Sequence, residues 1–435
     1  MWNFQTEPEF QVKLDWIEAF VRDECEPLDL RFGNPGDPYD VSNAASREIL
    51  KPLQDRVRAE GLWACHLGPD LGGKGYGQVK LALMNEILGR SMWSPTVFGT
   101  AAPDTGNAEI LAMFGSAEQK AKYLQPLLDG DIVSTFSMTE PQAGADPKEF
   151  TCAARRDGSD WVLDGEKWFS SNGRFAEFML VMAVTDRDSK PSRRLSMFVV
   201  PRGTPGVGIL RDVATLAESD DHGTGTHAYI RYDNVRLPAD AMLGEPGDGF
   251  KIAQARLGGG RVHHAMRTLG MCNRAFEMMR ERAVSRRTDG GLLADKQLVQ
   301  AFIADSAIEL RQYRLLVLHA AWTIDTQPHS REARLAIAMC KVAMANVSHD
   351  IVRRAVHLHG SLGVTHETPL AEFYMSVPLL ALADGPTEVH KLQVAKAMLA
   401  DAVPATCLFP TEHLPTKRAA ARERYSGILA RHGLV

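Results

Sequence analysis

The chain has 435 residues, which is enough for two or three domains with a sizeable hydrophobic core. Hydrophobic residues make up 45% of the sequence and charged residues 24%, which is ordinary for a soluble globular protein. The net charge of −5 argues against a partner such as nucleic acid or an anionic membrane, because these attract basic proteins.

Cysteine usage and hydropathy indicate where the protein resides. The six cysteines are scattered and form no CxxC pair, which predicts reduced thiols rather than a disulfide framework or a zinc site. The N-terminus lacks the basic-then-apolar run of a signal peptide. No stretch approaches the roughly 18 apolar residues of a membrane span. We therefore expect a soluble, cytoplasmic protein without membrane insertion.

Residues 1–133 are predicted to form an N-terminal helical domain. Val12, Trp16 and Phe20 recur at intervals of four, which places one apolar stripe on a helix. Clusters of Pro and Gly at 33–38 and 68–77 divide the region into separate helices.

Residues 134–243 have the pattern of a β domain. Short β-type runs such as FMLVMAVTD and LSMFVVPRG are separated by turns, among them Asp157-Gly158 and Asp164-Gly165. Strands at this spacing predict an antiparallel β-barrel or sandwich.

Beyond residue 243 the pattern returns to helix. Apolar residues follow steps of three and four through 299–317, and a second amphipathic run covers 335–358. Long helices with short connections predict a C-terminal four-helix bundle over 244–401, followed by a tail over 402–435. The expected fold class is therefore α+β multidomain. No GxGxxG follows a strand and no P-loop is present, which argues against a Rossmann or P-loop fold.

Four separated segments carry the most specific signal. They are FSMTEPQAGAD at 136–146, GEKWFSSNG at 165–173, HLHGSLG at 357–363 and ADGPTEVHK at 383–391. In this order and spacing they resemble the acyl-CoA dehydrogenase family, over roughly residues 1–400. The runs ARLGGGRVHHAMRTLG and ADGPTEVHK are similar to one branch, whose larger relatives are fused to a kinase-like domain and handle hydroxylated acyl-CoAs. No kinase domain is expected in this chain.

The resemblance implies FAD-dependent oxidation of an acyl-CoA to the trans-2-enoyl-CoA. A base removes the α-proton while a β-hydride passes to flavin N5. Asp384 stands at the position of the base, where most relatives have glutamate, and burial is expected to raise its pKa. Some relatives carry the base on the first long helix of the bundle, but the matching residue here is Gly260. Asp384 also suits the cap of a helix that begins at Pro386, and both roles can hold together.

The resemblance also implies contacts with FAD. Arg286 and Gln297 match residues that reach the FAD of a neighbouring subunit, and an arginine suits its pyrophosphate, although a solvated arginine would explain the sequence equally well. The other expected contacts lie beside the flavin ring (Phe136, Met138, Thr139, Trp168, Phe169 and Ser171), at the adenosine (His357, Gly360 and Ser361) and just after the base (Thr387 and Glu388).

Substrate contacts are expected from Ala145, Arg261, Gly385 and Lys396. Gly385 lets the backbone approach the ligand and offer an N–H to the thioester oxygen. Lys396 matches a basic residue near the CoA adenine, although a plain surface lysine explains it as well. The family usually has Ser or Thr in place of Ala145, and its hydroxyl would bond the ligand.

The implied partners are an acyl-CoA, an electron-transfer flavoprotein and further copies of the chain in a homodimer or homotetramer. A flavin oxidase of the same fold, acting on a nitroalkane or an acyl-CoA, is an alternative, because nitroalkane oxidases also use Asp as the base. A noncatalytic flavoprotein that binds DNA or a partner is a third possibility. The net charge of −5 disfavours it, because such relatives carry a basic face.

Overall fold

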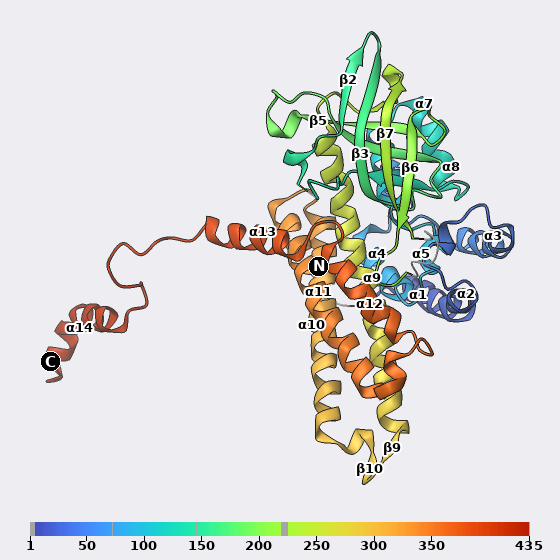
Figure 1. Cartoon of the computed structure of the whole chain (residues 1–435). Coiled ribbons are helices and arrows are strands. Elements are labelled where there is room, and N and C mark those ends of the chain that lie inside the picture. Colours follow the sequence, from blue (N-terminus) through green and yellow to red (C-terminus); the bar gives the residue numbers. More distant parts are fainter. Residues whose placement is uncertain (1–4, 72, 145, 219–224, 435) are drawn as a thin grey trace. The chain divides into compact units, whose positions relative to one another are not determined.

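The molecule is described by a computed structural model over residues 5–71, 73–144, 146–218 and 225–434. It divides into two units, Met1–Lys391 and Leu392–Val435. The first unit contains a group of N-terminal helices, a β-sheet and a bundle of long helices (Figure 1). The predicted order of helical domain, β domain and helical bundle is thus confirmed.

The first five N-terminal helices pack around a core that they share with the bundle, and the later ones pack against the β domain. In the first of them, Ile17 and Phe20 are buried as the apolar stripe predicts, but Val12 is 68% exposed. The buried face of this helix starts at Phe10 and continues through Leu14, so Val12 lies off it. The helices are α1 (Pro8–Phe20), α2 (Glu26–Arg31), α3 (Ala44–Ala59), α4 (Gly77–Leu88), α5 (Ser94–Val97), α6 (Asp104–Phe114), α7 (Ala117–Gln119) and α8 (Gln125–Leu128).

The β domain is an eight-stranded sheet with the order β6-β7-β3-β2-β4-β5-β8, in which β1 also pairs with β4. Most pairs are antiparallel, as predicted, but β1 and β2 each run parallel to β4. The sheet is therefore mixed. Its strands are β1 (Ser134–Ser137), β2 (Ala153–Asp157), β3 (Asp160–Ser171), β4 (Phe178–Val184), β5 (Leu195–Pro201), β6 (Val207–Val213), β7 (His227–Leu237) and β8 (Met242–Leu243).

The bundle is built from α9 (Gly249–Ser285), α10 (Gln297–Thr326), α11 (Arg331–His359) and α12 (Leu370–Leu382). A short hairpin, β9 (Arg287–Thr288) and β10 (Gly291–Leu292), joins α9 to α10. Helix α13 (Thr387–Ala400) begins in the first unit and ends in the second, which also holds α14 (Leu414–Arg431), a helix without buried residues.

Residues Arg331–Val364 are long and apolar enough to cross a membrane by length and composition. The sequence prediction found no such stretch. More than half of its most apolar part is buried inside the protein, and α11 packs against α9, α10 and α12. It is therefore a core helix of the bundle.

Helix α9 joins all parts of the first unit. Near its start, Ile252 and Ala253 pack in one core with strands β4 and β5 and helix α6. Further along, Val262 and Leu269 belong to the core that the N-terminal helices share with the bundle. Residues of α9 between these points consequently face the β domain, the N-terminal helices and the bundle.

Candidate active site

Asp384 lies in the short turn between α12 and α13. Its φ is +56°, a left-handed conformation that is uncommon for a residue with a side chain, and Gly385 follows with a φ of +109°. Arg261 of α9 fixes this turn, because its Nε donates a hydrogen bond of 2.8 Å to the backbone oxygen of Asp384. The strained turn directs the Asp384 carboxylate at α9.

Three consecutive glycines on α9 leave the space that the carboxylate occupies. A Cβ atom at Gly260 would lie 2.9 Å from Oδ2 of Asp384, and one at Gly259 would lie 3.0 Å from Oε2 of Glu109. A Cβ at Gly258 would meet no atom within 4 Å. Each glycine inside a helix costs about 1 kcal/mol relative to alanine, so this run weakens α9. The close approach of the Asp384 carboxylate explains the glycine at 260, and that of Glu109 explains the glycine at 259.

His264 lies one helical turn beyond Gly260, and its Nε2 is 3.4 Å from Oδ2 of Asp384. Burial lowers the pKa of His264 to about 4, against the opposing charge of Asp384. The ring is therefore neutral at pH 7. A neutral imidazole next to a carboxylate is favoured in the tautomer that turns its N–H toward the oxygen.

The pKa of Asp384 differs from the expected direction. Burial alone would raise it, but the cationic side chains of His264 when protonated, Arg256 and Arg261 on α9, and then Lys341 of α11, hold it below its ordinary value. The prediction of a raised pKa was wrong because it considered burial without these partners. Asp384 is therefore ionised at neutral pH, which is the form in which a carboxylate accepts a proton.

Lys341 completes the group of cations around Asp384. Its ammonium donates a hydrogen bond to the backbone oxygen of Leu380 at the end of α12. Burial lowers the pKa of Lys341 to about 8, and the charge of Asp384 opposes that shift. Lys341 is 1% exposed, so its charge acts in a poorly solvated region.

Helices α6 and α9 approach each other closely, and a charged side chain of each helix packs over a glycine of the other. Arg256 of α9 lies across Gly106 of α6, where a Cβ would come within 2.9 Å of its Cγ. Glu109 of α6 lies in turn across Gly259 of α9. Burial raises the pKa of Glu109 to about 7, which Arg256 partly offsets. This exchange brings a second titratable carboxyl group to the glycine face of α9.

Arg256 also connects this face to strand β1. Its guanidinium carbon lies 4.1 Å from the ring centroid of Phe136, and its Nε donates to Oδ1 of Asn107 at 2.8 Å. A buried cation over an aromatic ring is a favourable contact. Phe136, an expected flavin contact, is thus brought next to the cluster around Asp384.

The loop at 137–140 and strand β3 form one rigid wall. The buried ammonium of Lys167 donates to the backbone oxygen of Met138 at 2.7 Å and pairs with Glu140 at 2.8 Å. The backbone N–H of Trp168 donates to the backbone oxygen of Thr139 at 3.0 Å. Burial would raise the pKa of Glu140, but Lys167 holds it below its usual range. The two segments that the sequence singled out are therefore adjacent.

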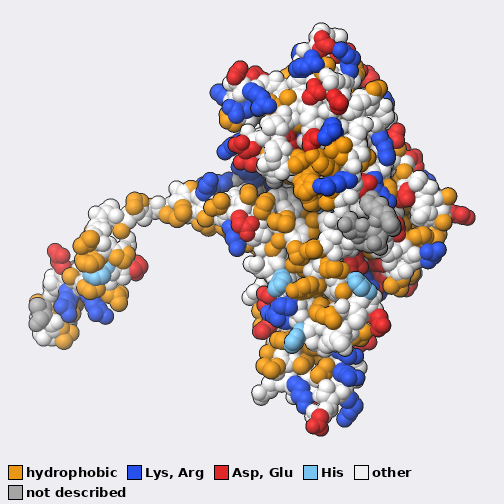
Figure 2. All heavy atoms as spheres, viewed as in Figure 1, with side chains coloured by type: hydrophobic (Ala, Val, Ile, Leu, Met, Phe, Trp, Pro, Cys, Tyr) orange, Lys and Arg blue, Asp and Glu red, His pale blue; other side chains and the backbone are white. Residues whose placement is uncertain are grey.

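The aromatic side chains of this wall fit a planar ring system such as the isoalloxazine of FAD. Phe169 has a φ of +54° and is 37% exposed, although its neighbour Ser170 is fully buried. Its ring packs edge-on against Trp168, with 4.7 Å between centroids. Figure 2 shows hydrophobic side chains gathered where the β domain meets the helices. Phe136, Met138, Thr139, Trp168, Phe169 and Ser171 would hold the flavin ring here.

Five other expected FAD contacts lie on the bundle and are exposed. Arg286 and Gln297 flank the β9–β10 hairpin, at the opposite end of the first unit from the β domain (Figure 1). His357, Gly360 and Ser361 end α11, where Gly360 has a φ of +66°. The structure does not bring Arg286 and Gln297 to the β-domain wall of the same chain. Their contact with the FAD of another subunit stays a prediction.

The remaining expected site residues differ in how far they are buried. Thr387 is buried and its hydroxyl donates to the backbone oxygen of Ala381 at 3.2 Å, which closes the turn that carries Asp384. Glu388 is exposed, and Lys396 is exposed within the second unit. Ala145 lies outside the described residues.

Sequence reasoning missed His264, Lys341, Arg256 and Glu109. His264 lies in the middle of α9, which begins at Gly249, and its ring contacts Asp384. The run of three glycines in α9 was the available signal, because it is costly in a helix and so indicates a close neighbour.

Comparison with known proteins identifies the family of the chain. Three family models match: the acyl-CoA dehydrogenase N-terminal domain at residues 9–131, the middle domain at 135–235 and the C-terminal domain at 247–399. FadE2 of Mycobacterium tuberculosis, named as a probable acyl-CoA dehydrogenase, is 42% identical over 85% of this chain and 91% of its own length. Acyl-CoA dehydrogenase family member 11 of Rattus norvegicus is 40% identical over 90% of this chain, which spans half of that relative.

Solved structures show the same relationship. A structure from Mycobacterium abscessus, whose assignment as an acyl-CoA dehydrogenase is provisional, is 37% identical with a TM-score of 0.82, over 91% of this chain and 99% of that one. A glutaryl-coenzyme A dehydrogenase, solved in complex with glutaryl-CoA, is 25% identical with a TM-score of 0.77, over 92% of this chain and 98% of that one. The chain is therefore an oxidoreductase that belongs to the acyl-CoA dehydrogenase family.

Proposed function

We propose that the protein catalyses the FAD-dependent α,β-dehydrogenation of an acyl-CoA thioester to the trans-2-enoyl-CoA, with Asp384 as the base. The observation that carries this proposal is the position of the Asp384 carboxylate. Its carboxylate lies over Gly260 and beside His264 of α9, a helix that packs in both the core of the β domain and the core of the bundle. Membership of the acyl-CoA dehydrogenase family and the solved glutaryl-CoA complex of a relative support the substrate class.

The described residues suit removal of an α-proton. The pKa of Asp384 is held low, so its carboxylate is available to accept the proton throughout the neutral range. Proton transfer by a positioned side chain of this kind contributes about 10²–10⁴-fold to a rate. The backbone at Gly385, which has no Cβ, allows the thioester to approach and offers an N–H to its oxygen as enolate charge develops.

FAD, when bound, supplies the acceptor for the β-hydride, so the substrate loses a proton to Asp384 and two electrons with the hydride. The wall formed by Phe136, Trp168 and Phe169 would orient the flavin ring and exclude water. We propose that Arg286 and Gln297 of a second copy complete the FAD site, which requires at least a homodimer. The electrons would then pass to an electron-transfer flavoprotein. The scattered free cysteines support a cytoplasmic location.

Anaerobic titration of the purified flavoprotein with a panel of acyl-CoAs tests the proposal. Bleaching of the flavin by at least one acyl-CoA, followed by slow reoxidation in air, is the expected result. Asp384→Asn should keep FAD and acyl-CoA binding and lose flavin reduction by about 10²–10⁴-fold. Asp384→Glu should keep part of the activity, because glutamate preserves the carboxylate and is only one methylene longer.

Three outcomes would contradict the proposal. Substantial flavin reduction by Asp384→Asn would remove Asp384 as the base. Reduction by nitroethane with rapid reoxidation in air would identify a nitroalkane oxidase, and rapid reoxidation after an acyl-CoA would identify an acyl-CoA oxidase.

A further inference from the structure

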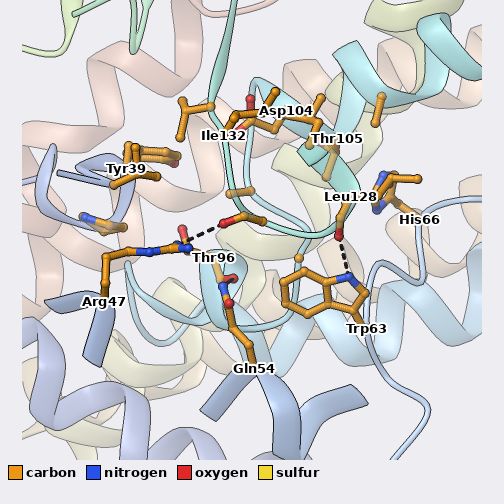
Figure 3. A pocket seen from close by; sticks show the side chains of 18 residues that line it. Tyr39, Arg47, Gln54, Trp63, His66, Thr96, Asp104, Thr105, Leu128 and Ile132 are labelled. Carbon is orange, nitrogen blue, oxygen red and sulfur yellow. Dashed lines mark hydrogen bonds between the residues drawn. The ribbon is translucent and has the colours of Figure 1, made fainter. Parts of the chain in front are cut away.

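A buried chain of hydrogen bonds joins α6, β1 and α9. Ser134 of β1 donates from its backbone N–H and its hydroxyl to Oδ1 of Asp104, at 2.8 and 2.6 Å. Nδ2 of Asn107 donates to the same hydroxyl oxygen at 2.8 Å, and Oδ1 of Asn107 accepts from Nε of Arg256 at 2.8 Å. Asp104, at the far end of the chain, lines the cavity shown in Figure 3. Asn107 is therefore the link between the strand and the arginine.

The middle of this chain is shielded from water. Ser134 and Asn107 are fully buried, and Arg256 is 8% exposed. Water cannot replace a lost partner in such a place, so each bond constrains the two groups that form it. The amide of Asn107 has only one orientation that suits both neighbours, because a guanidinium has no acceptor and must face the amide oxygen.

The hydrogen bond to Asn107 determines where the guanidinium of Arg256 lies. The charge of this group is attracted by three carboxyl groups at once, those of Asp384, Glu109 and Asp104. Coulomb attraction falls off gradually with distance, whereas a hydrogen bond needs a defined length and a nearly straight geometry. The amide of Asn107 consequently fixes a position that the three charges alone would leave open.

The contacts close into a ring on one face of β1. Ser134 and Phe136 are two residues apart on this strand, so their side chains point to the same face. The Ser134 hydroxyl holds the amide of Asn107, and this amide holds Arg256. The guanidinium carbon of Arg256 then lies 4.1 Å from the centroid of the Phe136 ring. A change at Asn107 therefore reaches both the cation that acts on Asp384 and the aromatic wall.

We propose that Asn107 is a positioning residue for the dehydrogenation, and that it acts by fixing the guanidinium of Arg256 over Phe136. The fixed guanidinium keeps the carboxylate of Asp384 aligned with the wall that would hold the flavin ring. This inference rests on the proposed acyl-CoA dehydrogenase activity. It adds a residue of α6 on which both sides of the site depend.

A double-mutant cycle on the FAD-loaded protein tests this dependence. Asn107→Leu keeps the size of the side chain and removes both hydrogen bonds. It should slow flavin reduction by an acyl-CoA about tenfold and weaken FAD binding, because the wall and the base lose their alignment. In an Arg256→Gln background the same change should have no further effect on either quantity, since the guanidinium that Asn107 positions is absent. Ser134→Ala removes only the hydroxyl and should show the same dependence on Arg256 with smaller effects.

The pH profile gives a readout that a loss of stability would not move. The acid limb of kcat/KM should move to higher pH in Asn107→Leu, because a guanidinium that is no longer fixed stabilises the carboxylate of Asp384 less. Asn85→Leu is the matched control, since Asn85 is also buried, at 2% exposure, and lies on α4, which packs against α9 as α6 does. That variant should leave the acid limb in place, and its effect on the rate should be the same with Arg256 as with Arg256→Gln.

The outcomes separate the two proposals. Equal losses from Asn107→Leu in both backgrounds, or an equal shift of the acid limb in Asn85→Leu, would overturn the positioning role. If Asn107→Leu does not fold, the cycle with Ser134→Ala decides in the same way. If no acyl-CoA reduces the flavin of the wild type, the proposed function fails, while the Kd of FAD in the four proteins of the cycle still decides whether Asn107 acts through Arg256. A wild type that binds no FAD would overturn both proposals.

Discussion

Gly260 and Asp384 are complementary in space: a Cβ atom at position 260 would lie 2.9 Å from Oδ2 of the aspartate. Real Cβ atoms do not come this close to a neighbouring atom. The carboxylate therefore occupies the volume that a side chain on α9 would fill. Position 260, where some relatives carry the base, therefore has no side chain in this protein, and a side chain there would clash with Asp384.

Gly260→Ala should displace the Asp384 carboxylate and lower the rate of flavin reduction by roughly tenfold or more, since misplacement by about 1 Å can cost up to about 100-fold. Gly258→Ala is the control, because a Cβ there meets nothing within 4 Å. Alanine improves helix propensity by about 1 kcal/mol, so Gly258→Ala should unfold at higher temperature, whereas the clash with Asp384 should offset this gain in Gly260→Ala. Stopped-flow reduction and thermal melting measure the two effects. Equal rates in the two variants would disprove the steric argument.

His264→Ala should lower flavin reduction because it removes the ring whose Nε2 lies 3.4 Å from Asp384. His264→Gln keeps an N–H donor and should restore part of the rate, which a purely structural loss would not allow. The acid limb of the kcat/KM profile should move to higher pH in the alanine variant, since His264 is the first of the groups that hold the pKa of Asp384 low. Identical profiles for both variants and the wild type would exclude this positioning role.

Arg256→Gln removes a buried cation that lowers the pKa of Asp384. Without it, Asp384 should accept its proton at higher pH, so the acid limb of kcat/KM should shift upward. Arg354→Gln is the control, because Arg354 is also buried but forms its ion pair with Glu309 at 2.5 Å. That variant should lower stability and leave the acid limb in place. Shifts of the same size in both would indicate a general structural effect.

The sequence predicts the order of the three regions because helical and strand periodicities are local signals. It does not predict that β1 pairs in parallel with β4, because Ser134 and Phe178 are 44 residues apart and nothing local sets their register. Asp384 was found because its neighbours form a recognisable motif. His264 and Glu109 reach the site from other elements, more than 100 residues away in the chain. The lowering of the Asp384 pKa depends on cationic side chains from such distant elements, so the local sequence does not predict it.

Lys167 and Glu140 form a fully buried ion pair that ties the loop at 137–140 to β3. Lys167→Met should cost about 3–5 kcal/mol of unfolding free energy, because it leaves Glu140 buried without a counter-charge. The double variant Lys167→Met with Glu140→Gln should be less destabilised than the single one. Urea unfolding and FAD retention measure the effect. A double variant less stable than Lys167→Met would contradict the electrostatic origin of the loss.

His66 and Asp104 both line a cavity between α3, the segment at 36–41 and the start of α6. They should make the free energy of unfolding depend on pH in opposite directions. Burial lowers the pKa of His66 from 6.5 to about 3, so between these values the unfolded chain binds a proton that the folded one does not. This contribution to stability is lost as the pH falls from 6.5. Burial raises the pKa of Asp104 from 3.8 to about 7, so the folded chain binds the extra proton and gains stability as the pH falls from 7.

The two contributions oppose each other between about pH 4 and 6.5, each with a slope approaching 1.4 kcal/mol per pH unit. His66→Gln removes the acid-induced loss, so on acidification this variant should gain unfolding free energy relative to the wild type. Asp104→Asn removes the acid-induced gain and should lose unfolding free energy relative to the wild type. Urea unfolding at pH 4.5, 5.5 and 6.5 gives both differences. The other titrating groups are common to all three proteins and cancel in the comparison, so parallel curves would show that neither side chain changes its protonation on folding.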